Sequence, residues 1–265
     1  MGGFNGGRQS DESCGHHLSW RRQSDESCGH LPSWKKRNDE SWAFVNLTNK
    51  RIERGLQLRS SFNTMDDLFP HKEAVDYSRI QMTEEGSYSI TRKRDSERIV
   101  TYMRDLMGTT NDKTITDATG CVGGDTISFA MNFKYVHSIE IKKDNYAALK
   151  ANINTFGLKN VTMYNGDATV GYKWYTDALY IDPPWGGPNY KEHPLLDLNM
   201  SNKRLDMWLE EILNRETRPR YIFLKLPQNY NFQRLTFLPN VDSVKHYQIR
   251  RFILFGMVIH PDKGC

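Results

Sequence analysis

The sequence predicts an α/β fold: a mostly parallel sheet whose last strand is antiparallel, with a small helical extension on its N-terminal side. Three observations lead to this prediction. Short apolar runs alternate with helical patterns through the middle of the chain, as in chains whose parallel strands are joined by helices. Acidic residues and glycines directly follow several of these runs. The last two runs are separated by Arg251 alone, which predicts antiparallel neighbours.

Each expected element follows from its local pattern. Apolar residues at helical spacing predict a helix over 95–107, capped by Asp95 or Ser96. The other expected helices are 125–133, 144–156 and 202–214, and the expected strands are 114–118, 135–141, 161–164, 178–181, 221–226, 244–250 and 252–259. Ligands of such sheets bind beyond the carboxyl ends of the strands. The acidic residues and glycines at those ends are therefore the candidate site.

Composition divides the 265 residues into three expected segments: a disordered repeat tail over 1–60, a helical extension over 61–108 and a catalytic domain over 109–265. In the tail, 8–20 and 22–34 are near-copies with a period of 14 residues, too short and too few to stack into a repeat fold. A zinc site is the alternative for the tail, from Cys14, His16 or His17, Cys28 and His30. Duplication alone accounts for those residues, and Cys-x-His is not a usual zinc spacing.

Several classes of protein are excluded by composition. The sequence has no apolar run of about 18 residues, the length that a membrane span needs, and no secretory signal at its start. Four scattered cysteines favour a reducing, intracellular compartment over a disulfide framework. The net charge of +4 is mild, although residues 201–265 carry eleven Lys and Arg against six Asp and Glu. That surplus fits either a nucleic-acid surface or an ordinary solvated one. Nothing in the pattern demands a metal.

The glycine-rich turn 119–124 is the candidate cofactor site, because such a turn lets a ligand approach the backbone. Glu140, at the end of the second strand, is expected to accept hydrogen bonds from ribose hydroxyls, and Asp167 from an adenine amino group. The turn lacks the Gly-x-Gly-x-x-Gly of NAD sites. Asp117 repels a pyrophosphate but suits a cationic methionine group, which favours S-adenosylmethionine. The expected cofactor-binding residues are Asp117, Thr119, Gly120, Cys121, Gly123, Gly124, Thr126, Glu140, Asp167, Ala168 and Asp182.

The loop after the fourth strand reads Asp-Pro-Pro-Trp-Gly-Gly-Pro over 182–188. The Asp182 carboxylate and the Pro183 carbonyl are expected to accept hydrogen bonds from an exocyclic amino group, and Pro184 fixes the direction of that carbonyl. Trp185 offers a ring on which a base can stack. Holding the amine in line with a sulfonium methyl group would be the main catalytic contribution, so Asp182, Pro183 and Trp185 are the expected catalytic residues. A rigid loop without chemistry is the alternative.

With these residues in view, the chain resembles the trimethylguanosine synthase family, the RNA cap guanine-N2 methyltransferases. The matching segments, within about residues 65–260, are 85–91, 117–130, 183–190 and 226–229. The resemblance implies a Rossmann-like class I methyltransferase sheet. It also implies methyl transfer from S-adenosylmethionine to the exocyclic N2 of a 7-methylguanosine cap, giving di- or trimethylguanosine.

The resemblance also implies roles for particular residues. Trp185 would stack on the cationic 7-methylguanine, with a cation–π contribution of about 1–2 kcal/mol. Pro184, Trp185 and Asn229 would bind the substrate, and the basic residues after position 200 would meet the cap phosphates and capped RNA. We expect a monomeric catalytic domain; the tail's partner stays open.

The chain departs from the family pattern at Asp182, where many members have Ser, at Cys121, where the usual residue is Gly, and at Arg92-Lys93, which replace Pro-Glu. Asp-Pro-Pro-Trp is also the motif of N6-adenine methyltransferases of RNA or DNA, which remain the alternative. A non-catalytic cap-binding module is the third interpretation. It is disfavoured because Asp182 and the Gly123-Gly124 pair are intact.

Overall fold

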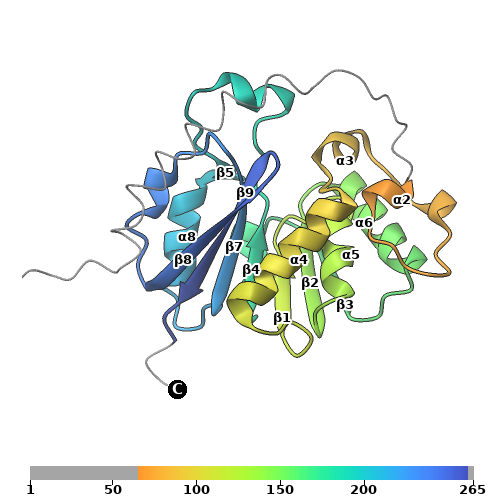
Figure 1. Cartoon of the computed structure of the whole chain (residues 1–265), viewed down its shortest axis with the longest axis horizontal. Helices are drawn as coiled ribbons and strands as arrows, with labels where there is room; N and C mark the ends of the chain where they lie inside the picture. The colour runs from red at the N-terminus through yellow and green to blue at the C-terminus, as the bar shows by residue number, and fades with distance from the viewer. Residues whose placement is uncertain (1–64, 262–265) are drawn as a thin grey trace, which may run out of the picture. The chain divides into compact units, whose positions relative to one another are not determined.

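Seven apolar runs of the sequence form the strands of one sheet in the computed structural model, which describes residues 65–261. The strand order is β3-β2-β1-β4-β7-β9-β8, with β7, β8 and β9 at the opposite end from β2 and β3 (Figure 1). The strands are β1 (Thr114–Asp117), β2 (Tyr135–Glu140), β3 (Val161–Asn165), β4 (Ala178–Ile181), β7 (Tyr221–Pro227), β8 (Val241–Ile249) and β9 (Phe252–Ile259).

The pairing of the strands confirms the predicted mostly parallel sheet. The strands β3, β2, β1, β4 and β7 pair in parallel. The last strand, β9, runs antiparallel to both β7 and β8. The turn between β8 and β9 holds Arg250 at a φ of +49°, which lets two long strands reverse through Arg250 and Arg251.

Helices cover both faces of this sheet. On one face lie α4 (Lys93–Met107), α5 (Gly124–Ala130) and α6 (Lys143–Thr155), and on the other lies α8 (Leu205–Leu213). Strand β4 shows how its side chains divide between the two layers. Ala178 and Tyr180 pack with α4 and α5, whereas Leu179 and Ile181 pack with α8. The side chains on both faces of this strand are therefore buried, as is usual in parallel sheets.

Short elements complete the described residues. They are α2 (Met65–Leu68), η1 (Tyr77–Arg79), α3 (Glu84–Ser89), α7 (Ala168–Gly171), η2 (Pro188–Glu192), β5 (Asn199–Met200), β6 (Lys203–Arg204) and η3 (Phe232–Leu235). The first three precede α4 and lie within the expected helical extension; the boundaries of the three expected segments stay predictions. Thr83 caps α3, since its hydroxyl accepts the N–H of Gly86 over 2.9 Å.

The structure corrects the starts of two predicted helices. It also ends the helix predicted over 125–133 at Ala130, and it places the strand predicted over 244–250 at Val241–Ile249. Neither Asp95 nor Ser96 caps α4: the helix begins at Lys93 after Arg92, which makes no side-chain cap bond, and both predicted caps are buried in its first turn. The helix predicted from 202 begins only at Leu205, because residues 199–204 form the β5–β6 hairpin with Ser201 at a φ of +52°. A local hairpin thus overrides helical spacing at this helix start.

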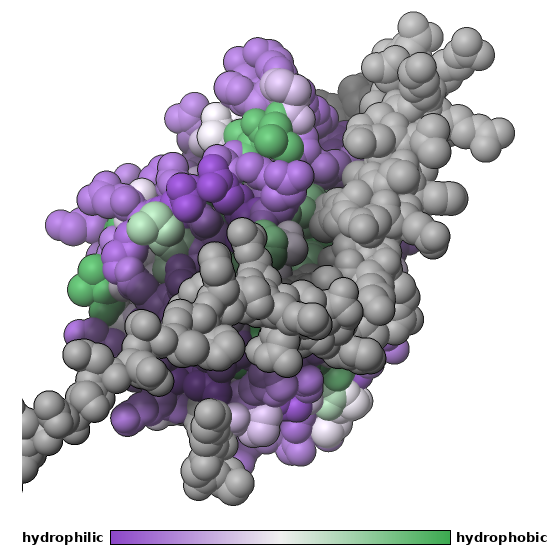
Figure 2. Space-filling model, turned by 90° about the vertical axis from the view of Figure 1, so that its left-hand side faces the viewer, coloured by the Kyte–Doolittle hydropathy of each residue, from purple (hydrophilic) through white to green (hydrophobic). Residues whose placement is uncertain are grey.

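Hydrophilic residues dominate the described surface on the face shown in Figure 2, where hydrophobic residues form separate patches. Within residues 65–261, no helix combines the length and hydrophobicity needed for a membrane crossing. The repeat tail and its alternative zinc site lie outside the described residues.

Candidate active site at the carboxyl ends of the strands

A cavity of about 830 Å³ opens beyond the carboxyl ends of β1, β2, β3, β4 and β7. It lies at the place predicted for ligands of a parallel sheet. The structure brings nine of the predicted site residues to its wall: Thr119, Cys121, Glu140, Asp167, Ala168, Asp182, Pro183, Pro184 and Trp185. Asp117, Gly120, Gly123, Gly124, Thr126 and Asn229 are not among the described residues that line it.

Asp117 ends β1 and is fully buried beneath the glycine-rich turn. Its carboxylate accepts the Thr119 N–H over 3.0 Å and the Thr126 hydroxyl over 2.6 Å. Burial raises the pKa of Asp117 to about 7, the Thr126 hydrogen bond lowers it, and the charge of Asp125 raises it. Asp117 therefore shapes the turn and places a titratable charge behind the cavity wall.

Protein contacts account for the glycines of this turn. A Cβ on Gly120 would lie 2.3 Å from Ser138 Oγ, and one on Gly124 would lie 2.7 Å from Ile90 Cγ1. Gly123 precedes α5 at a φ of +100°, a backbone conformation that residues other than glycine rarely adopt. The glycines thus let the turn pack closely, while Thr119 and Cys121 face the cavity. Contact between these glycines and a cofactor stays a prediction.

Glu140 ends β2 and is only 6% exposed. Its two carboxylate oxygens accept backbone N–H groups, from Cys121 over 2.8 Å and from Lys142 over 2.7 Å. Burial raises the pKa of Glu140, and both backbone hydrogen bonds lower it. The carboxylate is consequently held rigidly at the cavity wall, and its remaining lone pairs can accept further hydrogen bonds.

Asp167 lies two residues beyond β3 and caps α7. One carboxylate oxygen accepts both the N–H and the hydroxyl of Thr169, over 2.8 and 2.7 Å. The net effect of its environment lowers the pKa of Asp167, because hydrogen bonds from Thr169 and Ser201 outweigh its partial burial. Asp167 lines the cavity as an ionised acceptor, and its predicted contact with an adenine amino group stays a prediction.

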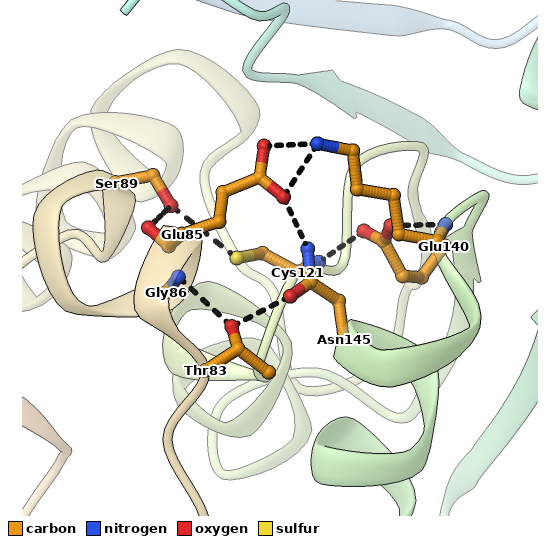
Figure 3. A network of polar contacts seen from close by, with 8 residues as sticks. Thr83, Glu85, Gly86, Ser89, Cys121, Glu140 and Asn145 are labelled. Carbon is orange, nitrogen blue, oxygen red and sulfur yellow. Dashed lines mark hydrogen bonds and ion pairs between the residues drawn. The ribbon is translucent and has the colours of Figure 1, made fainter. Parts of the chain in front are cut away.

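Helix α3 closes the side of the cavity beside the glycine-rich turn. Glu85 accepts hydrogen bonds from Lys142 Nζ over 2.8 Å and from Asn145 Nδ2 over 2.9 Å. Thr83 donates to Asn145 Oδ1 over 2.7 Å (Figure 3). The Ser89 hydroxyl lies 3.4 Å from the sulfur of Cys121. Composition alone did not reveal this network, and the only signal for it was the family-like segment 85–91.

The Asp182–Trp185 loop leaves β4 and enters the same cavity. The Asp182 N–H donates to the Thr119 hydroxyl over 2.9 Å, which joins this loop to the glycine-rich turn. Gly186 and Gly187, at φ values of +90° and +86°, turn the chain into η2. The ring of Tyr190 then meets Trp185 edge-on, with centroids 5.0 Å apart.

Asn229 supports η2, the segment that follows this loop. Its side-chain amide donates to the carbonyls of Tyr190 and His193, over 2.9 and 2.7 Å. The structure thus gives Asn229 a positioning contact with the segment that carries Tyr190. Direct contact between Asn229 and a base stays a prediction.

Lys225 of β7 is another site residue that sequence reasoning missed. It is 5% exposed, and its ammonium donates to Asp182 Oδ2 over 2.6 Å and to the Thr91 hydroxyl over 2.8 Å. Although burial opposes it, the carboxylates of Asp182 and Asp125 raise the pKa of Lys225. Burial raises the pKa of Asp182 to about 6, against the lowering effect of Lys225. The signal in the sequence was a single lysine inside an otherwise apolar strand.

Basic side chains also reach the cavity from separate elements. The cavity-lining cations on its described wall, besides Lys142 and Lys225, are Arg92, Lys191, Arg250 and Arg251. Arg250 pairs with Asp95 over 3.5 Å. No group of three His, Cys, Asp or Glu side chains within residues 65–261 has a geometry that could hold a metal ion.

The strand order, the single antiparallel last strand and the acidic residues at successive strand ends define a class I S-adenosylmethionine-dependent methyltransferase fold. A family model described as RNA cap guanine-N2 methyltransferase matches residues 112–252. The chain belongs to the RNA cap guanine-N2 methyltransferase family.

The chain is also similar to curated proteins, two of which are trimethylguanosine synthases. The chain is 34% identical over 55% of its length to uncharacterized protein L320 of Acanthamoeba polyphaga mimivirus, covering 56% of that protein. It is 26% identical over 62% of its length to trimethylguanosine synthase of Saccharomyces cerevisiae, covering 50% of it. It is 31% identical over 56% of its length to trimethylguanosine synthase of Schizosaccharomyces pombe, covering 63% of it. The match therefore spans between half and two thirds of each relative.

Proposed function

We propose that this protein transfers a methyl group from S-adenosylmethionine to the exocyclic N2 of a 7-methylguanosine RNA cap. The observation that carries the proposal is the meeting of two predicted sites in one cavity. The Asp182–Trp185 loop and the acidic strand ends Glu140 and Asp167 all line it. Membership of the RNA cap guanine-N2 methyltransferase family supports this substrate.

The residues present fit S-adenosylmethionine. Glu140, held at the wall by two backbone N–H groups, would accept the ribose hydroxyls, and Asp167 would accept the adenine amino group. Glu85, Glu140 and Asp167 place carboxylates on the cavity wall, which suits a cationic methionine group. When bound, S-adenosylmethionine supplies a methyl group activated by a positively charged sulfur.

The loop residues would bind and orient the acceptor base. Trp185 would stack against 7-methylguanine, whose positive charge adds a cation–π contribution. The Asp182 carboxylate and the Pro183 carbonyl would accept the amino hydrogens and so aim the nitrogen lone pair at the methyl donor. Pro184, the next residue of the rigid loop, would support this geometry.

The basic residues around the cavity would bind the phosphates of the cap. Arg92, Lys191, Arg250 and Arg251 lie among its lining residues, and phosphate contacts fix the register of a bound RNA without reading its sequence. Capped RNA is therefore the proposed partner. We further propose a monomeric catalytic domain that acts inside the cell.

The proposal is tested by mass spectrometry of cap analogues incubated with the purified protein and S-adenosylmethionine. A gain of one or two methyl groups on the 7-methylated cap, and none on the unmethylated cap, is the expected result. The number of methyl groups gained also separates a di- from a trimethylguanosine product. No gain on either cap, with N6-methyladenine appearing in an RNA or DNA oligonucleotide, would overturn the proposal.

A further inference from the structure

Lys225 is the only described cation that bonds directly to the Asp182–Trp185 loop through a side chain. The ammonium lies between two aromatic rings, 5.4 Å from the centroid of Trp185 and 5.2 Å from that of Phe252. It lies too deep to act as a simple surface counterion for RNA, because its side chain is only 6% exposed. Its position instead suits a permanent partner of the loop.

Asp182 is held once through its carboxylate and once through its backbone. Lys225 donates to Oδ2 of Asp182 over 2.6 Å, and the backbone N–H of Asp182 donates to Thr119 over 2.9 Å. Thr91 holds the ammonium in turn, over 2.8 Å. An amino group entering the cavity therefore meets a carboxylate whose orientation is already set. Such preorganisation is the main way a site can assist a transfer that depends on alignment.

Asp125 is the nearby negative charge that raises the pKa of Asp182. Thr91 and Tyr180 both donate to Asp125 Oδ2, over 2.7 and 2.9 Å, so Asp125 lies close behind the loop. The titratable groups that influence Asp182 or Lys225 from the surrounding elements are Asp117, Cys121, Asp125, Tyr180 and Tyr190. None of these five is a cation. Arg92, Arg250 and Arg251 line the same cavity, but Lys225 is the cation that bonds to Asp182. Lys225 opposes uptake of a proton by Asp182 most strongly, and a hydrogen bond from Trp185 adds a smaller effect.

We propose that Lys225 is a positioning residue, which holds the Asp182 carboxylate ionised and oriented so that it can accept a hydrogen bond from the acceptor amine. This inference rests on the proposed methyl transfer but concerns a residue outside the motifs that define it. A protonated Asp182 would present an O–H to the amine and would lose the strong charge-assisted hydrogen bond.

The test compares Lys225→Met with the wild-type protein across pH. In the wild-type protein, kcat should fall as pH drops through about 6, the value at which Asp182 takes up a proton. Without the nearby positive charge of Lys225, the pH at which kcat falls should rise by about one to three units. At pH 7 that shift corresponds to a loss of about 2- to 100-fold in kcat, recovered as the pH is raised. Lys225→Arg, which retains the charge, should keep the profile near that of the wild type.

Lys245→Met is the matched control. Lys245 also lies 2.6 Å from an aspartate oxygen, that of Asp105, but this pair is about half exposed and joins β8 to α4. Its loss should leave the pH profile unchanged. If Lys225→Met fails to fold in a thermal melt, Lys225→Gln, which keeps a hydrogen-bond donor without the charge, replaces it.

A second readout does not depend on activity. The carboxyl carbon of Asp182, assigned in ¹³C-aspartate-labelled protein by its loss in Asp182→Asn, should titrate at a higher pH in Lys225→Met than in the wild type. An unchanged titration in a folded variant would overturn the role of Lys225. A wild-type protein that methylates no cap would instead overturn the proposed function, and the titration would still decide whether Lys225 sets the charge of Asp182.

Discussion

The backbone N–H of Cys121 donates to Oε2 of Glu140 over 2.8 Å, so the glycine-rich turn and the end of β2 are joined at one wall of the cavity. The other oxygen of Glu140 accepts the Lys142 N–H over 2.7 Å. One carboxylate thereby orders the turn, the start of α6 and the proposed ribose site. A substitution of Glu140 should therefore weaken cofactor binding more than it weakens binding of the acceptor base.

Glu140→Gln should weaken binding of S-adenosylmethionine by at least about tenfold, or about 1.4 kcal/mol. The new amide group would turn an N–H toward one of the two backbone N–H donors and leave that donor without an acceptor. Isothermal titration calorimetry measures the effect. Glu97→Gln, at an exposed position on α4, is the control. An affinity equal to that of the wild type would exclude Glu140 from the cofactor site.

Trp185→Ala should weaken binding of a 7-methylated cap by about 1–3 kcal/mol, the usual worth of an aromatic ring stacked on a base. Methyl transfer should fall to background, while affinity for S-adenosylmethionine should change little. Steady-state kinetics and calorimetry give the two quantities. Phe237→Ala, at an exposed aromatic outside the cavity lining, should change neither. Loss of cofactor binding would mean that Trp185 contacts the methyl donor instead.

Gly86→Ala should loosen α3 from the cavity wall. The added Cβ would lie 2.6 Å from Val122 Cγ1 and 3.0 Å from Thr83 Oγ1, and overpacking of this kind costs about 1–3 kcal/mol. The free energy of urea unfolding and hydrogen exchange across α3 measure the change. Gly171→Ala in α7 is the matched control, since its Cβ would meet nothing within 4 Å. Equal stability of the two variants would show that α3 moves aside at little cost.

Asp117→Asn should flatten the dependence of stability on pH. Because burial raises the pKa of Asp117 to about 7, the native state takes up this proton more readily than the unfolded state. The wild-type protein should therefore lose stability as pH rises from 5 through 7. The variant should reduce the difference in unfolding free energy between pH 5 and pH 8 by more than about 1.4 kcal/mol, the equivalent of one pKa unit. Asp144→Asn, at an exposed position on α6, should retain the wild-type slope.

Removal of residues 1–60 should leave methyl transfer to a dinucleotide cap analogue unchanged. The described residues that line the cavity run from Leu68 to Phe252, and they supply all of the proposed contacts. The kcat and KM of the shortened and full-length chains provide the comparison. Complete loss of activity in a folded shortened chain would place part of the tail in the active site.

Local pattern alone determined most of the sheet. Apolar runs alternating with helical patterns predicted both ends of β4 and of β9 correctly. The same pattern placed Asp117, Glu140 and Asp182 at or next to strand ends. The carboxyl ends of parallel strands lie at one edge of the sheet. Residues at those ends therefore lie near one another, regardless of the conformation of the loops. The same reasoning brought Trp185 to the cavity.

Only the tertiary structure decided which side chains bond to one another. Lys225 lies 43 positions from Asp182 and 134 from Thr91 along the chain, and no local spacing indicates that their polar atoms meet. Likewise, packing against Ser138 and Ile90 accounts for Gly120 and Gly124, and the amide of Asn229 holds a loop. Sequence periodicity specifies which face of an element is buried. Hydrogen bonds between distant elements form only when packing brings donor and acceptor within about 3 Å.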